Sequence, residues 1–220
     1  MGGNEVSIKA VIFDLDGVIV STDEYHYKAW KQMADEEKIY FDKEINEKLR
    51  GVSRRESLQI ILNISKRVYT EPDKRGLADR KNEYYRELLN NLTSRDILPG
   101  VMLFLKELKR NNIKIAIGSS SKNAKFILNK IGLMNCFDAV ADGNEIKNSK
   151  PDPEVFLLAA KKLVIHPRNC LVVEDADAGV EAAISGGMKV LGVGSASKNS
   201  WVDFKSDSLI NINFEKIFIL

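Results

Sequence analysis

The sequence has little cysteine, no long apolar run and almost no excess charge, and each shortage excludes a class of protein. Its two cysteines, Cys136 and Cys170, cannot build a disulfide framework, so we expect core thiols in a reducing compartment. No apolar run approaches the roughly 20 residues that span a bilayer, and the amino terminus lacks the pattern of a signal peptide. We therefore expect a cytoplasmic protein with no membrane partner.

The charges of the chain nearly cancel, because 33 Lys and Arg residues face 31 Asp and Glu residues, for a net charge of +2. This balance gives no broad cationic surface of the kind that holds nucleic acid by counterion release. With 220 residues, 44% of them apolar, the chain is long enough for one core with an insertion. We expect a monomer that binds small molecules and no nucleic acid.

What the sequence does contain is a series of short β-branched runs that alternate with helical periods. The runs, each typical of a buried strand, are 8–13, 113–117, 139–141, 171–173 and 190–193. The helical stretches are 102–110, 124–131, 154–163 and 178–185. The alternation predicts an α/β fold with a doubly wound parallel sheet of Rossmann-like type. In such sheets ligands bind beyond the carboxyl ends of the strands.

The region 20–92 differs, because its apolar residues follow a helical period and no convincing strand occurs there. The predicted long helices are 25–37, 53–68 and 73–91, and the segment ILPG at 97–100 marks the return to the core. We therefore predict an inserted all-helical cap domain, residues 20–92, and an α/β catalytic core formed by residues 1–19 and 93–220. A cap over the strand ends would exclude water from a site there.

Polar residues follow several of the predicted strands. The acids among them would repel one another at the end of apolar strands unless a divalent cation neutralised them, and carboxylate oxygens suit Mg²⁺. Because Mg²⁺ usually shares its shell with substrate phosphate, this set indicates phosphoryl transfer. The polar residues are Asp14, Asp16, Ser119, Lys150, Glu174 and Asp175.

Asp14 and Asp16 suit two different tasks in such a reaction. Asp14 can be the nucleophile that forms an aspartyl phosphate, and Asp16 can pass a proton as general acid and base. Gly17 lets the backbone turn and approach the phosphate closely. The alternative is that the two acids merely begin a loop, with Ser119 as a turn hydroxyl and Lys150 as a surface cation. Their common position after strand ends favours the functional interpretation.

On these residues the sequence resembles the haloacid dehalogenase superfamily, over nearly its whole length. The matching segments, in the family's order, are FDLDGVI at 13–19, Ser119 after the second strand, SKPDP at 149–153 and EDADAG at 174–179. The resemblance implies that Asp14 is the nucleophile and that Ser119 and Lys150 hold the transferring phosphoryl group. It also implies a Mg²⁺ site, made by Asp14, the carbonyl of Asp16, Asp175 and, near the metal, Glu174.

The segment RGVSRRESL at 50–58 is the most informative part of the cap. Ser53 and Glu56 form a capping-box pattern that opens a helix. A helix amino terminus near Arg50, Arg54 and Arg55 suits a second phosphate, and the alternative is an exposed, charged first turn.

Three cap segments, STDEYHYKAW at 21–30, RGVSRRESL and DRKNEYY at 79–85, resemble the β-phosphoglucomutase branch of that superfamily. The resemblance implies interconversion of β-D-glucose 1-phosphate and β-D-glucose 6-phosphate, with β-D-glucose 1,6-bisphosphate as priming intermediate. It assigns Arg54 to the phosphate that is not transferred, His26 to the sugar hydroxyls and Thr22 to the hinge. The other substrate-binding residues that it implies are Trp30, Gly51, Ser57, Lys81, Asn82, Ser120, Ser121, Lys122 and Asn123. The chain departs from the branch's pattern at Ser21, Asp23, Ser120 and Ala176.

Two other functions stay open. A sugar-phosphate phosphatase of the same fold would release inorganic phosphate at every turnover, whereas a mutase must protect its aspartyl phosphate from water. A noncatalytic sensor would close its cap around a sugar phosphate without any covalent phosphate on Asp14. Trp30 fits either the sugar pocket or the core of the cap.

Overall fold

A computed structural model describes residues 7–49, 52–210 and 212–218 of the chain. In this part, six parallel strands form one sheet in the order β3-β2-β1-β4-β5-β6. The strands are β1 (Ala10–Phe13), β2 (Lys114–Gly118), β3 (Ala139–Ala141), β4 (Cys170–Glu174), β5 (Lys189–Val193) and β6 (Phe204–Ser206). The doubly wound α/β fold expected from the sequence is thereby confirmed.

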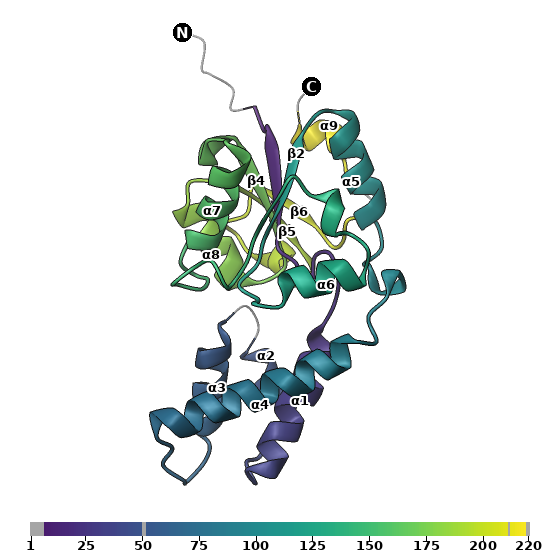
Figure 1. Ribbon diagram of the computed structural model, residues 1–220. Coiled ribbons are helices and arrows are strands. Elements are labelled where there is room, and N and C mark those ends of the chain that lie inside the picture. The colour runs from purple at the N-terminus through teal and green to yellow at the C-terminus, as the bar shows by residue number, and fades with distance from the viewer. Residues whose placement is uncertain (1–6, 50–51, 211, 219–220) are drawn as a thin grey trace.

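Helices cover both faces of the sheet, so its central strands β1 and β4 are buried throughout and nearly all of their residues are apolar (Figure 1). One face carries α5 (Val101–Arg110), α6 (Ala124–Lys130) and α9 (Phe214–Ile217), and the other α7 (Glu154–Leu163) and α8 (Asp177–Ser185). Along β1, Val11 and Phe13 pack into the first layer and Ala10 and Ile12 into the second. Short 3-10 turns lie at Ser94–Asp96, Met134–Cys136, Pro167–Asn169 and Gly194–Lys198.

The cap consists of helices that pack on one another below the carboxyl ends of the strands in Figure 1. Its helices are α1 (Asp23–Glu36), α2 (Lys43–Glu47), α3 (Arg54–Leu62) and α4 (Glu71–Leu89). They bury a separate apolar cluster that includes Trp30, Met33, Ile61 and Leu77. None of the described helices has both the length and the apolarity that a membrane crossing needs.

The chain enters and leaves the cap at one place. Val20 and Ile97 form an antiparallel bridge, and the Leu98 N–H donates to the Ile19 carbonyl at 2.9 Å. The two connections therefore lie side by side and can act as one hinge. All four cap helices fall inside the predicted insertion of residues 20–92, whose boundaries stay a prediction.

Several sequence-based bounds were wrong. The helix expected over 53–68 ends at Leu62, where the N–H groups of Ile64 and Ser65 reach back only three residues, to Ile61 and Leu62, and so tighten the last turn. The elements α2, β6 and α9 were not predicted at all. Each spans five residues or fewer and is too short for a hydrophobic period to show.

The two cysteines are free. Cys170 is buried on β4, as expected of a core thiol, and Cys136 is only half-buried. The reducing compartment, the monomeric state and the absence of a nucleic-acid partner stay predictions.

Candidate active site

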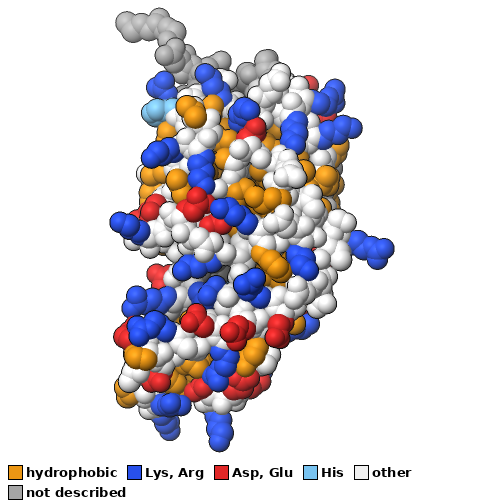
Figure 2. Space-filling model, in the orientation of Figure 1, with side chains coloured by type: hydrophobic (Ala, Val, Ile, Leu, Met, Phe, Trp, Pro, Cys, Tyr) orange, Lys and Arg blue, Asp and Glu red, His pale blue; other side chains and the backbone are white. Residues whose placement is uncertain are grey.

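A cleft of about 810 Å³ separates the carboxyl ends of the strands from the cap. Of the predicted site residues that the structure describes, all line it except Thr22. Thr22 is fully buried behind the cleft, and Gly51 and Arg50 lie outside the described residues. Figure 2 shows lysine and arginine side chains gathered along the waist where core and cap meet, a distribution that favours an anionic ligand.

The floor of the cleft is a buried charge cluster around Lys150. Its Nζ donates to Asp14 Oδ1 at 2.5 Å and to Glu174 Oε2 at 2.7 Å. The other oxygen of Glu174 accepts the backbone N–H groups of Asp175 and Ala176, both at 3.1 Å. Burial disfavours the charge of Lys150, but the two carboxylates prevail and raise its pKa. Lys150 is therefore a fixed cation beside the proposed nucleophile.

The Asp14 carboxyl follows β1 directly and is 7% exposed. Burial, with repulsion from Glu174 added, raises its pKa to about 6 even though Lys150 opposes the shift. It still ionises below neutral pH, as a nucleophilic carboxylate must.

A metal ion fits beside this cluster. Asp14, Glu174 and Asp175 are buried, and each offers one oxygen within 4.8 Å of the others. Three carboxylates against the single ammonium of Lys150 leave an excess of negative charge, and hard oxygen donors suit a divalent cation such as Mg²⁺. The Asp16 carboxylate is not part of this group, so its assignment to the metal depends on its backbone carbonyl.

Gly17 is required by the geometry of this edge. Its φ of 81° lies in the left-handed region, and a Cβ at this position would stand 2.1 Å from Asp175 Oδ2. The backbone turn expected at Gly17 is thus present and lies against the proposed metal ligand Asp175, while the close approach to phosphate stays a prediction.

Asp16 faces the cap rather than the charge cluster. Its Oδ1 accepts the backbone N–H of Thr22 at 3.0 Å and also the Thr22 hydroxyl. Burial raises the pKa of Asp16 to about 7, against these hydrogen bonds and with help from Asp14. A carboxyl that holds its proton near neutral pH is suited to general acid catalysis.

Two side chains of the cap, His26 and Lys81, lie beside Asp16. His26 Nε2 is 3.9 Å from Asp16 Oδ2, and its Nδ1 is 3.0 Å from Lys81 Nζ. Lys81 Nζ lies 4.5 Å from the Trp30 ring centroid and 4.6 Å from that of Tyr85. Burial, together with repulsion from Arg54, lowers the pKa of Lys81 well below its usual range. Burial also lowers the pKa of His26, with Lys81 and Arg54 adding to the effect.

Arg54 sits in the first turn of α3, whose start was predicted correctly. The Ser53 and Glu56 side chains form the expected reciprocal capping box. Arg54 Nη2 donates to Asn82 Oδ1 at 2.7 Å, and Asn123 Nδ2 of the core donates to the same oxygen at 2.9 Å. The proposed second phosphate site therefore spans both parts of the molecule. Its neighbour Arg55 points outward and pairs with Glu71 at 3.3 Å.

The serines of the loop after β2 lie at the junction. Ser119 is buried, and its hydroxyl accepts the Ser121 N–H at 3.2 Å. Ser121 Oγ in turn accepts the Asn123 N–H at 3.2 Å. Ser57, on the first turns of α3, is buried at the opposite wall of the cleft.

Tyr85 is a site residue that the sequence analysis missed. It lines the cleft with 1% of its surface exposed, and its hydroxyl lies 2.8 Å from Thr22 Oγ1. Its helical spacing gives the signal of an ordinary cap-core aromatic. Only the tertiary contact with Thr22, 63 positions away, reveals that it supports Asp16.

Comparison with known proteins shows the family to which this chain belongs. A family model described as haloacid dehalogenase-like hydrolase matches residues 8–187. A β-phosphoglucomutase of Bacillus subtilis is 47% identical over 85% of this chain and 84% of that protein. A phosphorylated carbohydrates phosphatase of Thermotoga maritima is 32% identical over 83% of both. The crystal structure of a β-phosphoglucomutase from Clostridium difficile superposes with a TM-score of 0.90 at 45% identity, covering 96% of this chain and 95% of that one. The chain belongs to the haloacid dehalogenase-like hydrolase family.

Proposed function

We propose that this chain is a β-phosphoglucomutase, which interconverts β-D-glucose 1-phosphate and β-D-glucose 6-phosphate. The observation that carries the proposal is one cleft with the buried carboxylate cluster around Lys150 on its floor and a second cationic group, Arg54, on its cap side. A mutase needs both, because its bisphosphate intermediate presents two phosphates at once. The likeness to the β-phosphoglucomutases of B. subtilis and C. difficile supports the same activity.

Transfer of a phosphoryl group from β-D-glucose 1,6-bisphosphate to the enzyme uses Asp14, Asp16 and Lys150. An Asp14 oxygen attacks phosphorus, the bond between phosphorus and the departing sugar oxygen breaks, and Asp16 gives its proton to that oxygen. Lys150 and Ser119 hold the oxygens of the transferring group. A Mg²⁺ ion on Asp14, the Asp16 carbonyl and Asp175, with Glu174 beside it, would neutralise charge that develops on the phosphoryl oxygens.

With Asp14 phosphorylated, the other half-reaction runs in the opposite direction on β-D-glucose 1-phosphate. The free hydroxyl of the sugar gives its proton to Asp16 while its oxygen attacks the phosphoryl group on Asp14, which forms β-D-glucose 1,6-bisphosphate and frees Asp14. The bisphosphate then turns around and gives its other phosphoryl group to Asp14, which releases β-D-glucose 6-phosphate, so each phosphate occupies the Arg54 end once. His26 and Lys81 would orient the sugar hydroxyls against Asp16.

The proposal is tested by ³¹P NMR of the protein with Mg²⁺, β-D-glucose 1-phosphate and a trace of glucose 1,6-bisphosphate. Glucose 6-phosphate should grow from the β-anomer and not from the α-anomer, with little free phosphate. Asp14→Asn should abolish this conversion while the fold survives. A dominant signal of inorganic phosphate would instead make the chain a phosphatase, the activity for which its T. maritima relative is named.

A sensor without catalysis is excluded by the same experiment if either product accumulates. Tight binding of the sugar phosphate without any turnover, and without a covalent phosphate on Asp14, would be the result that favours it.

A further inference from the structure

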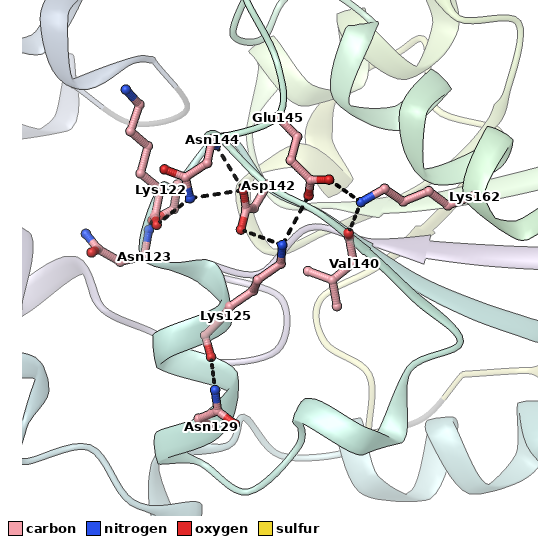
Figure 3. Close-up of polar contacts among 10 residues, drawn as sticks. Lys122, Asn123, Lys125, Asn129, Val140, Asp142, Asn144, Glu145 and Lys162 are labelled. Carbon is pink, nitrogen blue, oxygen red and sulfur yellow. Dashed lines mark hydrogen bonds and ion pairs between the residues drawn. The ribbon is translucent and has the colours of Figure 1, made fainter.

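The loop that follows β3, residues 142–145, lies against the loop 119–123 that bears the proposed phosphate-binding side chains. Asp142 begins it and has no exposed surface, although the proposed mechanism gives it no task. Its Oδ1 accepts the backbone N–H of Asn144 at 2.9 Å and the Asn144 side-chain Nδ2 at 3.1 Å (Figure 3). One carboxylate oxygen therefore fixes both the backbone and the amide of Asn144.

The Asn144 amide reaches from this anchor to the substrate side. The same Nδ2 donates to the Lys122 carbonyl at 2.9 Å. The side chains of Lys122 and Asn123 point away from Asp142 in Figure 3, and both line the cleft. Asn144 thus holds the Lys122 carbonyl in place, on the side of the loop opposite to the Lys122 and Asn123 side chains that line the cleft.

A second contact joins the two loops without any side chain. The Gly143 N–H donates to the Ser121 carbonyl at 3.2 Å, and a Cβ on Gly143 would stand 2.2 Å from the Ser120 carbonyl oxygen. The backbones are therefore too close for any other residue at position 143. A shift of one loop has to move the other.

The Asp142 side is itself tied to two core helices. Lys125 of α6 places Nζ 3.6 Å from Asp142 Oδ2 and 3.3 Å from Glu145 Oε1. Lys162 of α7 donates to Glu145 Oε2 at 2.5 Å and to the Val140 carbonyl at 2.6 Å. The brace consequently rests on rigid helices, which are more precise supports than a free surface loop.

The charges across the cleft indicate which part of the substrate this loop meets. Asn123 shares the Asn82 oxygen with Arg54, the residue proposed for the phosphate that is not transferred. Lys122 adds a cation from the same loop. A loop placed only 1 Å away from its productive position would hold this phosphate poorly.

We propose that Asp142 and Asn144 are positioning residues, which hold the 121–123 backbone so that Lys122 and Asn123 bind the non-transferred phosphate of the sugar substrate. This role rests on the proposed function. Asp142 and Asn144 would then affect binding of the substrate and not the phosphoryl transfer at Asp14.

The test compares Asn144→Ala with Asn129→Ala. Both asparagines are exposed, and both donate Nδ2 to a backbone carbonyl at 2.9 Å, but Asn129 reaches only Lys125 within α6 (Figure 3). Because a hydrogen bond has a modest net value, Asn144→Ala should raise KM for β-D-glucose 1-phosphate about three- to tenfold with a smaller change in kcat. Asn129→Ala should leave both constants at wild-type values. On p-nitrophenyl phosphate, which carries no phosphate besides the one that is transferred, the loss in Asn144→Ala should be smaller.

Variants of Asp142 show whether it acts through Asn144. Asp142→Ala should raise KM at least as much as Asn144→Ala, and Asp142→Asn should restore part of the loss because an amide oxygen can still accept from Asn144. In the double variant Asp142→Ala with Asn144→Ala the two effects should not add, since both remove the same bond. Thermal unfolding is recorded for each protein, and the exposed Asn144 keeps the test valid if Asp142→Ala does not fold.

Three results would overturn the proposal. They are equal KM values for Asn144→Ala and Asn129→Ala, equal losses on the sugar phosphate and the small ester, or additive effects in the double variant. If wild-type protein releases inorganic phosphate instead of isomerising the sugar, the proposed function fails. The positioning role is then tested separately, by comparing KM values for phosphate release. No turnover of any sugar phosphate would overturn both.

Discussion

Replacing Lys81 by methionine should make the protein more stable at neutral pH. Lys81 is 2% exposed, and its Nζ has His26 Nδ1 at 3.0 Å and two aromatic rings around it. Burial and the nearby Arg54 lower its pKa far below the value of 10.5 that a free lysine has, although Asp16 opposes the shift. The affinity of Lys81 for a proton is therefore lower in the folded protein than in the unfolded chain.

The sign and size of the effect follow from this difference. Since the unfolded chain binds the proton more tightly than the folded protein does, wild-type stability falls as pH drops below the unfolded pKa. The slope is about 1.4 kcal/mol per pH unit until the pH reaches the folded pKa. Lys81→Met has no such group and keeps most of the packing volume. The gap in unfolding free energy should be smallest near pH 10 and widen towards pH 7 in favour of the variant.

Urea unfolding of both proteins at pH 7, 8, 9 and 10 measures this gap, because the other titrating groups cancel in the difference. A variant that is less stable at pH 7, or a gap that stays constant with pH, would refute the reasoning. The variant should also lose turnover of the sugar phosphate, a trade of activity for stability that is common at binding sites.

Three more substitutions have defined outcomes. Gly17→Ala should lower the thermal midpoint and weaken Mg²⁺ binding in a titration. Its Cβ would stand 2.1 Å from Asp175 Oδ2, and its φ of 81° adds a backbone strain of about 1–3 kcal/mol. Wild-type values for both the midpoint and the Mg²⁺ affinity would contradict this. Ser53→Ala should cost about 1 kcal/mol of stability by removing the cap on the Glu56 N–H, measured by urea unfolding against Ser200→Ala as an exposed control. Asp16→Asn should slow phosphoryl transfer by about 10²–10⁴-fold yet leave the Mg²⁺ titration unchanged, and an unaltered rate would remove its role as general acid.

The core of the fold could be predicted because its strands are buried on both faces. β1 and β4 are apolar at nearly every position, so they appear in the sequence as short runs, and the polar residue that follows each run marks the edge where ligands bind. That rule selected Asp14 and Asp175, which the structure places in one buried carboxylate group. Parallel topology alone was enough to bring together residues so distant in sequence.

Short elements could not be predicted, because tertiary contacts and not local pattern stabilise them. β6 has three residues, none fully buried, and is defined by its pairing with β5. The same limit applies to the site. The contact of Tyr85 with Thr22 and the reach of Asn144 to Lys122 join segments that carry no common motif. Such partners become visible only when the chain is folded.

The place of β1 in the sheet also bears on how the newly made chain acquires its structure. β1 is central, and Ala10 pairs with Lys114 on one side and with Cys170 on the other. A ribosome finishes the whole cap before either partner strand exists, while the cap helices need mainly one another. We expect protease to spare residues 23–89 of a nascent chain halted at a length at which these residues have left the ribosome but β4 has not, and to cut the rest of the emerged chain, and the opposite pattern would refute this order. β1 is thus the first strand to be synthesised, but it cannot complete its pairing until β4 has been made. The inserted cap therefore folds before the core that contains it.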